Sequence, residues 1–120
     1  MENRQTDESD VIENEVVEAI REEIREEIAD LEDYARRGEE PPRCMGYRFK
    51  VNGQAFIWNE DHIEGRQVLE LAGLTPPHDY TLRLKIAGQK PRKVELNETI
   101  NLRAPGIEKF KALPRDQTEG

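Results

Sequence analysis

The chain has 120 residues and a formal net charge of −8, and 37% of its residues are charged against 35% that are hydrophobic. This length suits one domain of ordinary size, and the small hydrophobic share indicates that part of the chain stays outside the core. The net negative charge argues against a general nucleic-acid binder, because the phosphate backbone repels acidic surfaces.

The charge is unevenly distributed along the chain. Residues 1–42 hold 16 acidic residues and 5 arginines, a net of −11, whereas residues 43–120 hold 10 acidic and 13 basic residues, a net of +3. The sequence therefore predicts an acidic arm followed by a mildly basic domain.

The sequence lacks the residues that several kinds of site require. Cys44 is the single cysteine, which excludes an intramolecular disulfide and argues against a cysteine-based metal site, so we expect it to be a half-buried small side chain. There is no Ser-His-Asp set and no phosphate loop, and we expect no catalysis, no metal and no bound cofactor. No apolar run approaches the roughly 20 residues of a membrane span, and residues 1–10 do not resemble a signal peptide, so we expect a cytoplasmic protein.

The arm is expected to contain a long amphipathic helix. Residues 1–10 show no periodicity and are predicted to be disordered, and a helix is predicted over residues 11–37. Gly38 can close this helix, and Pro41-Pro42 cannot continue it. Apolar residues at steps of three and four form one stripe, and five of them define the expected helix interface: Val17, Ile20, Ile24, Ile28 and Leu31.

The apolar stripe has three interpretations. It can form a short coiled coil with a second copy or a partner, it can pack on the chain's own domain, or it can belong to a single helix supported by Glu–Arg pairs. The coiled coil is favoured, although Glu27 interrupts the heptad pattern. Because the domain is expected to begin at residue 44, a protein that lacks residues 1–43 is predicted to fold.

Alternation of apolar and polar residues replaces the helical period after residue 45. Asn52-Gly53 is the strongest short hairpin signal, and it separates the first two alternating runs. The predicted elements are strands over residues 47–51 and 54–59, a helix over residues 64–74, and strands over residues 80–86, 93–96 and 107–113.

One face of the predicted sheet is expected to be basic. If the large apolar residues of the strands point towards the helix, alternation places the intervening basic residues on the outer face. This face can simply keep the sheet soluble, or it can bind an acidic partner surface or the chain's own acidic helix. The residues of the expected partner-binding face are Arg48, Lys50, Arg83, Lys85, Lys109 and Lys111.

Three separated motifs narrow the fold class. The runs YRFKVNGQAFIW, IEGRQVLELAGL and INLRAPGIEKF occur in this order, and together they resemble the multiubiquitin-type bacterial ubiquitin-like domain. The resemblance covers about residues 45–114 and implies an α+β fold with a ubiquitin-like β-grasp domain. It places this domain at residues 44–113, after a helix and linker at residues 11–43 and before a flexible tail at residues 114–120.

The resemblance also implies that the protein is a modifier of other proteins. Such modifiers are activated at a C-terminal glycine, here Gly120, by an activating enzyme that uses ATP, and a conjugating enzyme then helps to attach them to targets through an isopeptide bond. A JAB-type zinc peptidase can remove them. Glycine suits the activated position because it has no Cβ to clash in a narrow channel. Arg115, Thr118 and Glu119 are the expected recognition residues of the tail; eukaryotic modifiers end in two glycines, whereas Glu119 precedes Gly120 here.

The sequence leaves two other functions open. The chain can be a β-grasp adaptor or scaffold that is never conjugated and binds partners through its helix. It can also be a sulfur carrier that forms a thiocarboxylate, although that class normally ends in Gly-Gly and has no long N-terminal helix. An independent enzyme is the least favoured class.

Overall fold

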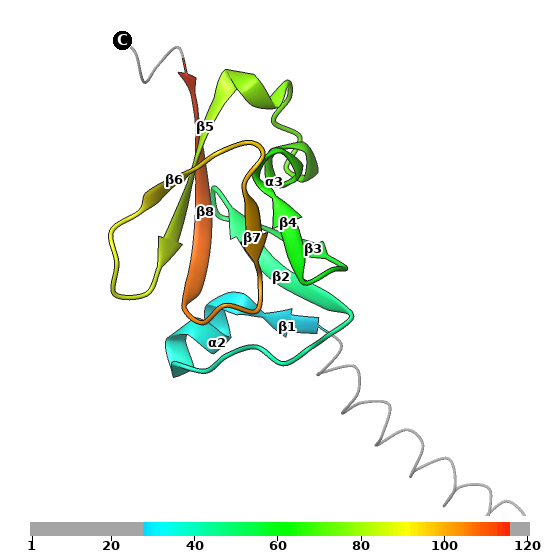
Figure 1. Cartoon of the computed structure of the whole chain (residues 1–120), viewed down its shortest axis with the longest axis vertical. Helices are drawn as coiled ribbons and strands as arrows, with labels where there is room; N and C mark the ends of the chain where they lie inside the picture. Colours follow the sequence, from blue (N-terminus) through cyan, green and yellow to red (C-terminus); the bar gives the residue numbers. More distant parts are fainter. Residues whose placement is uncertain (1–27, 116–120) are drawn as a thin grey trace, which may run out of the picture.

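The computed structural model describes residues 28–115 (Figure 1). Three expectations fall on the other residues: the disordered segment 1–10, the helix over residues 11–27 with Val17, Ile20 and Ile24, and the tail after Arg115. These expectations lie outside the described residues and stay predictions.

The described residues form an α+β fold, as the sequence predicts. One mixed sheet has the strand order β1-β2-β8-β5-β6, with β3 paired to β2, and β4 and β7 form a small second sheet. The strands are β1 (Ile28–Asp30), β2 (Gly46–Val51), β3 (Gln54–Trp58), β4 (His62–Glu64), β5 (Tyr80–Ile86), β6 (Arg92–Val94), β7 (Thr99–Asn101) and β8 (Ile107–Pro114). The helices are α2 (Leu31–Arg37), α3 (Gly65–Leu71) and the short 3-10 helix η1 (Pro77–Asp79).

The hairpin of β2 and β3 forms where Asn52-Gly53 predicts it. Both turn residues have positive φ, 53° at Asn52 and 85° at Gly53, which is the backbone that a two-residue hairpin turn with the strand twist requires. The antiparallel register runs from Tyr47 opposite Trp58 to Val51 opposite Gln54. The hairpin motif is therefore confirmed.

The core lies between the sheet and α3. The residues that alternation places on the inner face are almost fully buried in β2, β5 and β8, from Tyr47 to Phe110. Phe49 and Phe110 meet edge to face, with ring centroids 5.2 Å apart. Val68 and Leu69 of α3 complete the same cluster, and no polar or charged residue of the described part is buried.

The helix predicted over residues 11–37 is confirmed at residues 31–37 and wrong at residues 28–30. Residues 28–30 are strand β1, which runs parallel to the start of β2, and only residues 31–37 are helical. In the strand, alternation buries Ala29 and leaves Ile28 exposed, so the expected helix interface does not extend to Ile28. Leu31 is buried in the domain core instead. The sheet therefore begins at residue 28 and not at residue 44.

Residues 28–30 form a strand because one edge of β2 is otherwise open. β3 occupies one edge of β2 from Tyr47 to Val51, and β8 meets the other edge only at Val51, opposite Phe110. The first residues of that edge would keep unpaired backbone N–H and C=O groups, and β1 pairs with them.

Gly38, with φ 69°, closes α2 as the sequence predicts.

The remaining elements follow the prediction with shifted ends. Helix α3 ends at Leu71, earlier than the predicted residue 74, and β6 covers residues 92–94 rather than 93–96. Strands β4 and β7 were not predicted, because each has only three residues and a single buried apolar side chain, Ile63 or Ile100. Figure 1 shows β1 and α2 at the end of the body opposite to the end of β8. Within residues 28–115, no helix is long and apolar enough to cross a membrane.

Candidate functional site: the basic face of the sheet and the end of β8

Strand alternation creates the basic face that the sequence predicts. Leu82 and Leu84 of β5 are buried, so the intervening Arg83 and the following Lys85 point to the other face of the sheet. On β8, Phe110 and Ala112 are buried, and Lys109 and Lys111 alternate with them in the exposed positions. The inward and outward sets of these two strands are confirmed.

The strand register brings these cations directly opposite one another. Arg83 lies opposite Lys111 of β8 on one side and opposite Lys93 of β6 on the other, and Lys85 lies opposite Lys109. Cβ atoms of directly opposed residues are about 4.5–5.5 Å apart in antiparallel sheets. One row of like charge therefore crosses three neighbouring strands, and a second row crosses two.

This part of the face is also hollowed. A depression of about 270 Å³ is lined by Pro91 and by four of the cations, Arg83, Lys85, Lys109 and Lys111. Lys85 is half-buried, donates a hydrogen bond to the carbonyl oxygen of Ile86 at 2.9 Å, and has Glu108 3.8 Å away. The concave shape and the charge together suit an anionic ligand.

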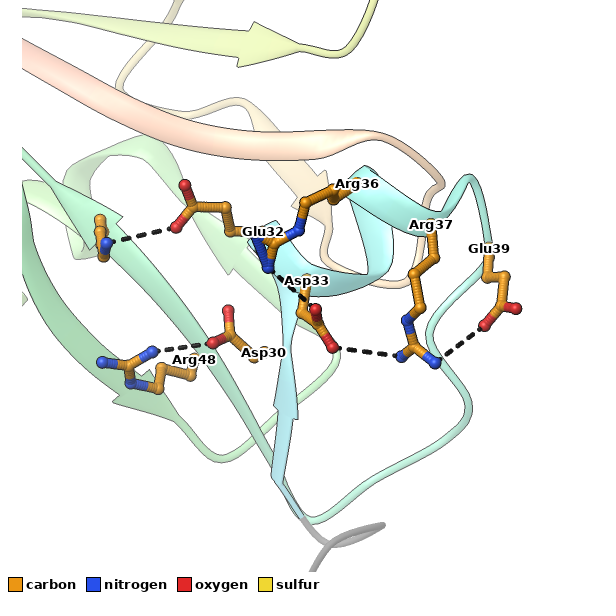
Figure 2. A network of polar contacts seen from close by, with 8 residues as sticks. Asp30, Glu32, Asp33, Arg36, Arg37, Glu39 and Arg48 are labelled. Atoms are coloured by element: carbon orange, nitrogen blue, oxygen red, sulfur yellow. Dashed lines mark hydrogen bonds and ion pairs between the residues drawn. The ribbon is translucent and has the colours of Figure 1, made fainter.

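Arg48 and Lys50 of β2 belong to a different environment. Asp30 of β1 accepts a 2.8 Å hydrogen bond from Arg48, and Glu32 of α2 lies 3.3 Å from Lys50. Figure 2 shows these carboxylates reaching towards β2 beside a second network, in which Asp33 binds Arg36 and Arg37. The six predicted residues are therefore divided: the two on β2 are paired with acidic residues of the preceding segment, and the four on β5 and β8 surround the depression.

The end of β8 carries the chain towards the predicted tail. Tyr80 of β5 lies opposite Pro114, and the Arg115 guanidinium donates to the carbonyl oxygen of Tyr80 at 3.4 Å. Arg115, expected to act in tail recognition, is thus half-buried against the start of β5. Thr118, Glu119 and Gly120 lie outside the described residues.

Cys44 is half-buried, as the sequence predicts, and its backbone N–H donates to the Tyr47 hydroxyl at 2.8 Å.

In the described part of the chain no group of three or more His, Cys, Asp or Glu residues is placed to hold a metal ion. Within residues 28–115, a hydrogen bond from the His62 imidazole to Asp61, at 2.7 Å, is the main cause that lowers the pKa of the Asp61 carboxyl.

Sequence reasoning missed Lys93 and the two acidic partners on the arm side. Lys93 joins the basic face only through its register with Arg83, and no spacing in the sequence reveals a register between separate strands. Asp30 and Glu32 were placed on the acidic helix, whose contact with the basic face was one of the open alternatives, but neither residue was identified as a partner. The signal for Lys93 was its alternation with the buried Val94.

The comparisons with known proteins give one match. A model of the family described as Multiubiquitin matches residues 47–115. No curated protein and no solved structure matches the chain. The family match begins at β2, and so it does not include β1 and α2.

Proposed function

The chain belongs to the multiubiquitin family, and we propose that it is a bacterial ubiquitin-like protein modifier, attached to target proteins through Gly120. The observation that carries this proposal is the family match over residues 47–115, which supports a ubiquitin-like, β-grasp domain. The modifier role, the bacterial source and the enzymes of the pathway are inferred from what that resemblance implies.

The direction of β8 supports the use of the tail. This strand ends at Pro114, which has no backbone N–H to continue the ladder, and Figure 1 places its end at one extremity of the body. Five residues follow Arg115, and five residues can span at most about 18 Å. An activating enzyme can therefore hold the domain at its surface while Gly120 reaches a reactive centre nearby.

The chemistry would take place at the carboxylate of Gly120. This carboxylate attacks the α-phosphorus of ATP, and pyrophosphate leaves as the acyl adenylate forms. A cysteine thiolate of the enzyme then attacks the acyl carbon and releases AMP. Transfer to a lysine amine of the target forms the isopeptide bond and returns the thiol. The domain supplies recognition, and a zinc peptidase of the JAB type would reverse the last step.

Glu119 sets a condition on the cognate enzyme. Its carboxylate adds negative charge next to the atom that must approach ATP, so the channel of the enzyme should carry a cation near Glu119. We expect Glu119→Lys to slow adenylate formation, with Asp116→Lys as a control that makes the same change of charge three residues earlier. An unchanged rate of adenylate formation for Glu119→Lys would contradict the presence of a cation near Glu119 in the enzyme channel.

The test of the proposal uses the activating-enzyme-like protein encoded nearest to this chain. Full-length protein is incubated with this enzyme and ATP, and its intact mass is measured with and without a reducing agent. We expect a thioester to the enzyme that a reducing agent breaks and that deletion of Gly120 abolishes. Replacement of one oxygen by sulfur would instead identify a sulfur carrier.

A second candidate is an adaptor that is never conjugated, and the basic face is the observation that favours it. Four cations around one depression, Arg83, Lys85, Lys109 and Lys111, are a binding surface that needs no covalent chemistry. If neither a thioester nor sulfur is found with an active enzyme, the adaptor becomes the better description.

A further inference from the structure

We propose that the outer basic surface of this domain binds the acidic segment 1–27 of the same chain. By the outer basic surface we mean Arg83 and Lys85 of β5, Lys93 of β6, and Lys109 and Lys111 of β8. This inference does not depend on conjugation through Gly120, and it assigns an occupant to a surface and a role to a segment that the family match does not include.

The first argument is that the surface is unfavourable when it is empty. Like charges directly opposite each other destabilise a sheet, and here Lys111, Arg83 and Lys93 form one such row while Lys109 and Lys85 form another. Within residues 28–115, Lys85 forms one ion pair, with Glu108 at 3.8 Å, and the other four cations have no ion pair. A ligand that brings negative charge would relieve this repulsion.

The second argument is the location of the negative charge in the sequence. Residues 1–27 contain 11 acidic residues and 3 arginines, a net of −8. Residues 28–115 contain 13 acidic and 15 basic residues, a net of +2, and residues 116–120 add −2. Segment 1–27 thus carries a charge equal to that of the whole chain, and it is covalently attached to the body that carries the basic surface.

The third argument is that the residues immediately after this segment already make such contacts. Asp30 meets Arg48 and Glu32 meets Lys50, both on β2. Strand β8 lies beside β2, and Phe110, between Lys109 and Lys111, is opposite Val51, the residue after Lys50. The paired cations of β2 and the unpaired cations of β8 are therefore neighbours across adjacent strands.

The segment is long enough to reach the surface. β5 is two strand spacings from β2, about 10 Å, and Val51 lies about 17 Å along the strand from Gly46, which is opposite Ile28. The direct path from Ile28 is thus about 20 Å, which six or seven extended residues can span. Segment 1–27 can turn back from Ile28 and still place many carboxylates over the surface.

Covalent attachment also favours this occupant over an external one. Exposed ion pairs are individually weak and are screened by salt. A tethered ligand has an effective concentration on the order of millimolar, so weak contacts suffice to keep it bound. An acidic partner protein would have to displace segment 1–27, which gives the arm the role of a competitor for the basic surface.

Zero-length cross-linking with a carbodiimide tests the contact in the full chain, because it joins a lysine amine to a carboxylate only where the two touch. We expect the monomer fraction at low salt to contain peptides that link Lys93, Lys109 or Lys111 to acidic residues of segment 1–27. These links should be lost in about 0.5 M NaCl, where the Debye length is only a few ångströms. Lys50 linked to Glu32 is the internal positive control, and Lys90, in the turn between β5 and β6, is the negative one.

Thermal unfolding of the full chain gives an independent test. The sign of the change in Tm distinguishes a surface to which segment 1–27 is bound from an empty surface. If the segment is bound, Lys109→Gln with Lys111→Gln lowers the Tm, and added salt lowers the Tm of the parent protein more than that of the variant. If the surface is empty, the same double variant raises the Tm, because it removes repulsion. Lys90→Gln is the matched control and should leave the Tm unchanged.

Two results would overturn the proposal. One is a Lys50–Glu32 link without any link from the outer basic surface to segment 1–27, together with a raised Tm for the double variant. The other is a set of links found only in a dimer fraction, which would assign the occupant to the arm of a second copy.

Discussion

Asn52 and Ala112 exchange two hydrogen bonds although 60 residues separate them in the sequence. The Asn52 side-chain amide donates to the Ala112 carbonyl oxygen at 3.1 Å, and its oxygen accepts from the Ala112 N–H at 2.9 Å. The Asn52 backbone N–H also donates to Phe110. One residue therefore forms the hairpin turn and ties that turn to β8, the strand that carries the predicted tail.

Replacing Asn52 by glycine should separate these two roles. Glycine accepts the positive φ of the turn, so the loss reflects the two side-chain hydrogen bonds, and we expect the free energy of unfolding to fall by about 1–3 kcal/mol. Urea denaturation measures this change. Asn59→Gly, at an exposed loop position, is the control and should change stability by about 0.5 kcal/mol or less. Equal effects of the two variants would show that the contacts with Ala112 contribute nothing.

Leu31 should contribute to stability as a core residue, although the sequence places it in an arm. Its side chain is 1% exposed and packs in the main cluster, so Leu31→Ala is expected to destabilise the protein by about 2–5 kcal/mol. Ile28→Ala is the control, because Ile28 is 41% exposed and its loss should be below about 1 kcal/mol. Chemical denaturation of both variants gives the comparison.

The structure also reverses the expectation for a truncated protein. Deletion of residues 1–43 removes β1 and α2 with their buried side chains, and it reopens the edge of β2. We expect this truncation to unfold at a lower denaturant concentration than the full chain, whereas deletion of residues 1–27 keeps every described contact. If the protein that lacks residues 1–43 is as stable as the full chain, residues 28–37 belong to an arm outside the domain and the prediction is wrong.

Gly65 should not tolerate a side chain, for reasons of space. A Cβ at this position would overlap the carbonyl oxygen of Glu95 and crowd the Val94 side chain, and the backbone there is held by hydrogen bonds from Gly65 to Glu98 and from Arg66 to Leu96. Gly65→Ala is expected to lower the free energy of unfolding by about 1–3 kcal/mol. Arg66→Ala, at the next and exposed helical position, should change it by about 0.5 kcal/mol or less. Thermal unfolding of both variants checks the difference.

Asp61 should titrate more acidically than an ordinary aspartate. The hydrogen bond from His62 favours the ionised carboxylate and lowers its pKa in the folded state. The resulting stabilisation is complete above the pKa of an unfolded aspartate and is lost as the pH falls through the lower pKa of the folded state. Carboxyl carbon NMR over an acidic titration measures this pKa, and His62→Ala should raise it. A carboxyl pKa that is the same in both proteins would contradict the assigned cause.

The sequence by itself determined the central strands, the hairpin and the family. Alternation over residues 47–51, 80–86 and 107–113 identified β2, β5 and β8 because a strand with one buried face must repeat with a period of two. Asn52-Gly53 identified the hairpin because few residue pairs adopt the backbone of that turn. The three motifs in their order indicated the family that the match over residues 47–115 then showed.

The tertiary structure alone decided what residues 28–37 do and which cations oppose each other. Ile28, Leu31 and Tyr34 have helical spacing, yet the open edge of β2 recruits residues 28–30 as a strand, because pairing exposed backbone groups is a non-local gain that periodicity cannot contain. The rows through Arg83 likewise depend on the registers of β8, β5 and β6, which are fixed by packing between segments distant in sequence. The sequence could show a basic face, and only the assembled sheet could show that its cations lie directly opposite one another on neighbouring strands.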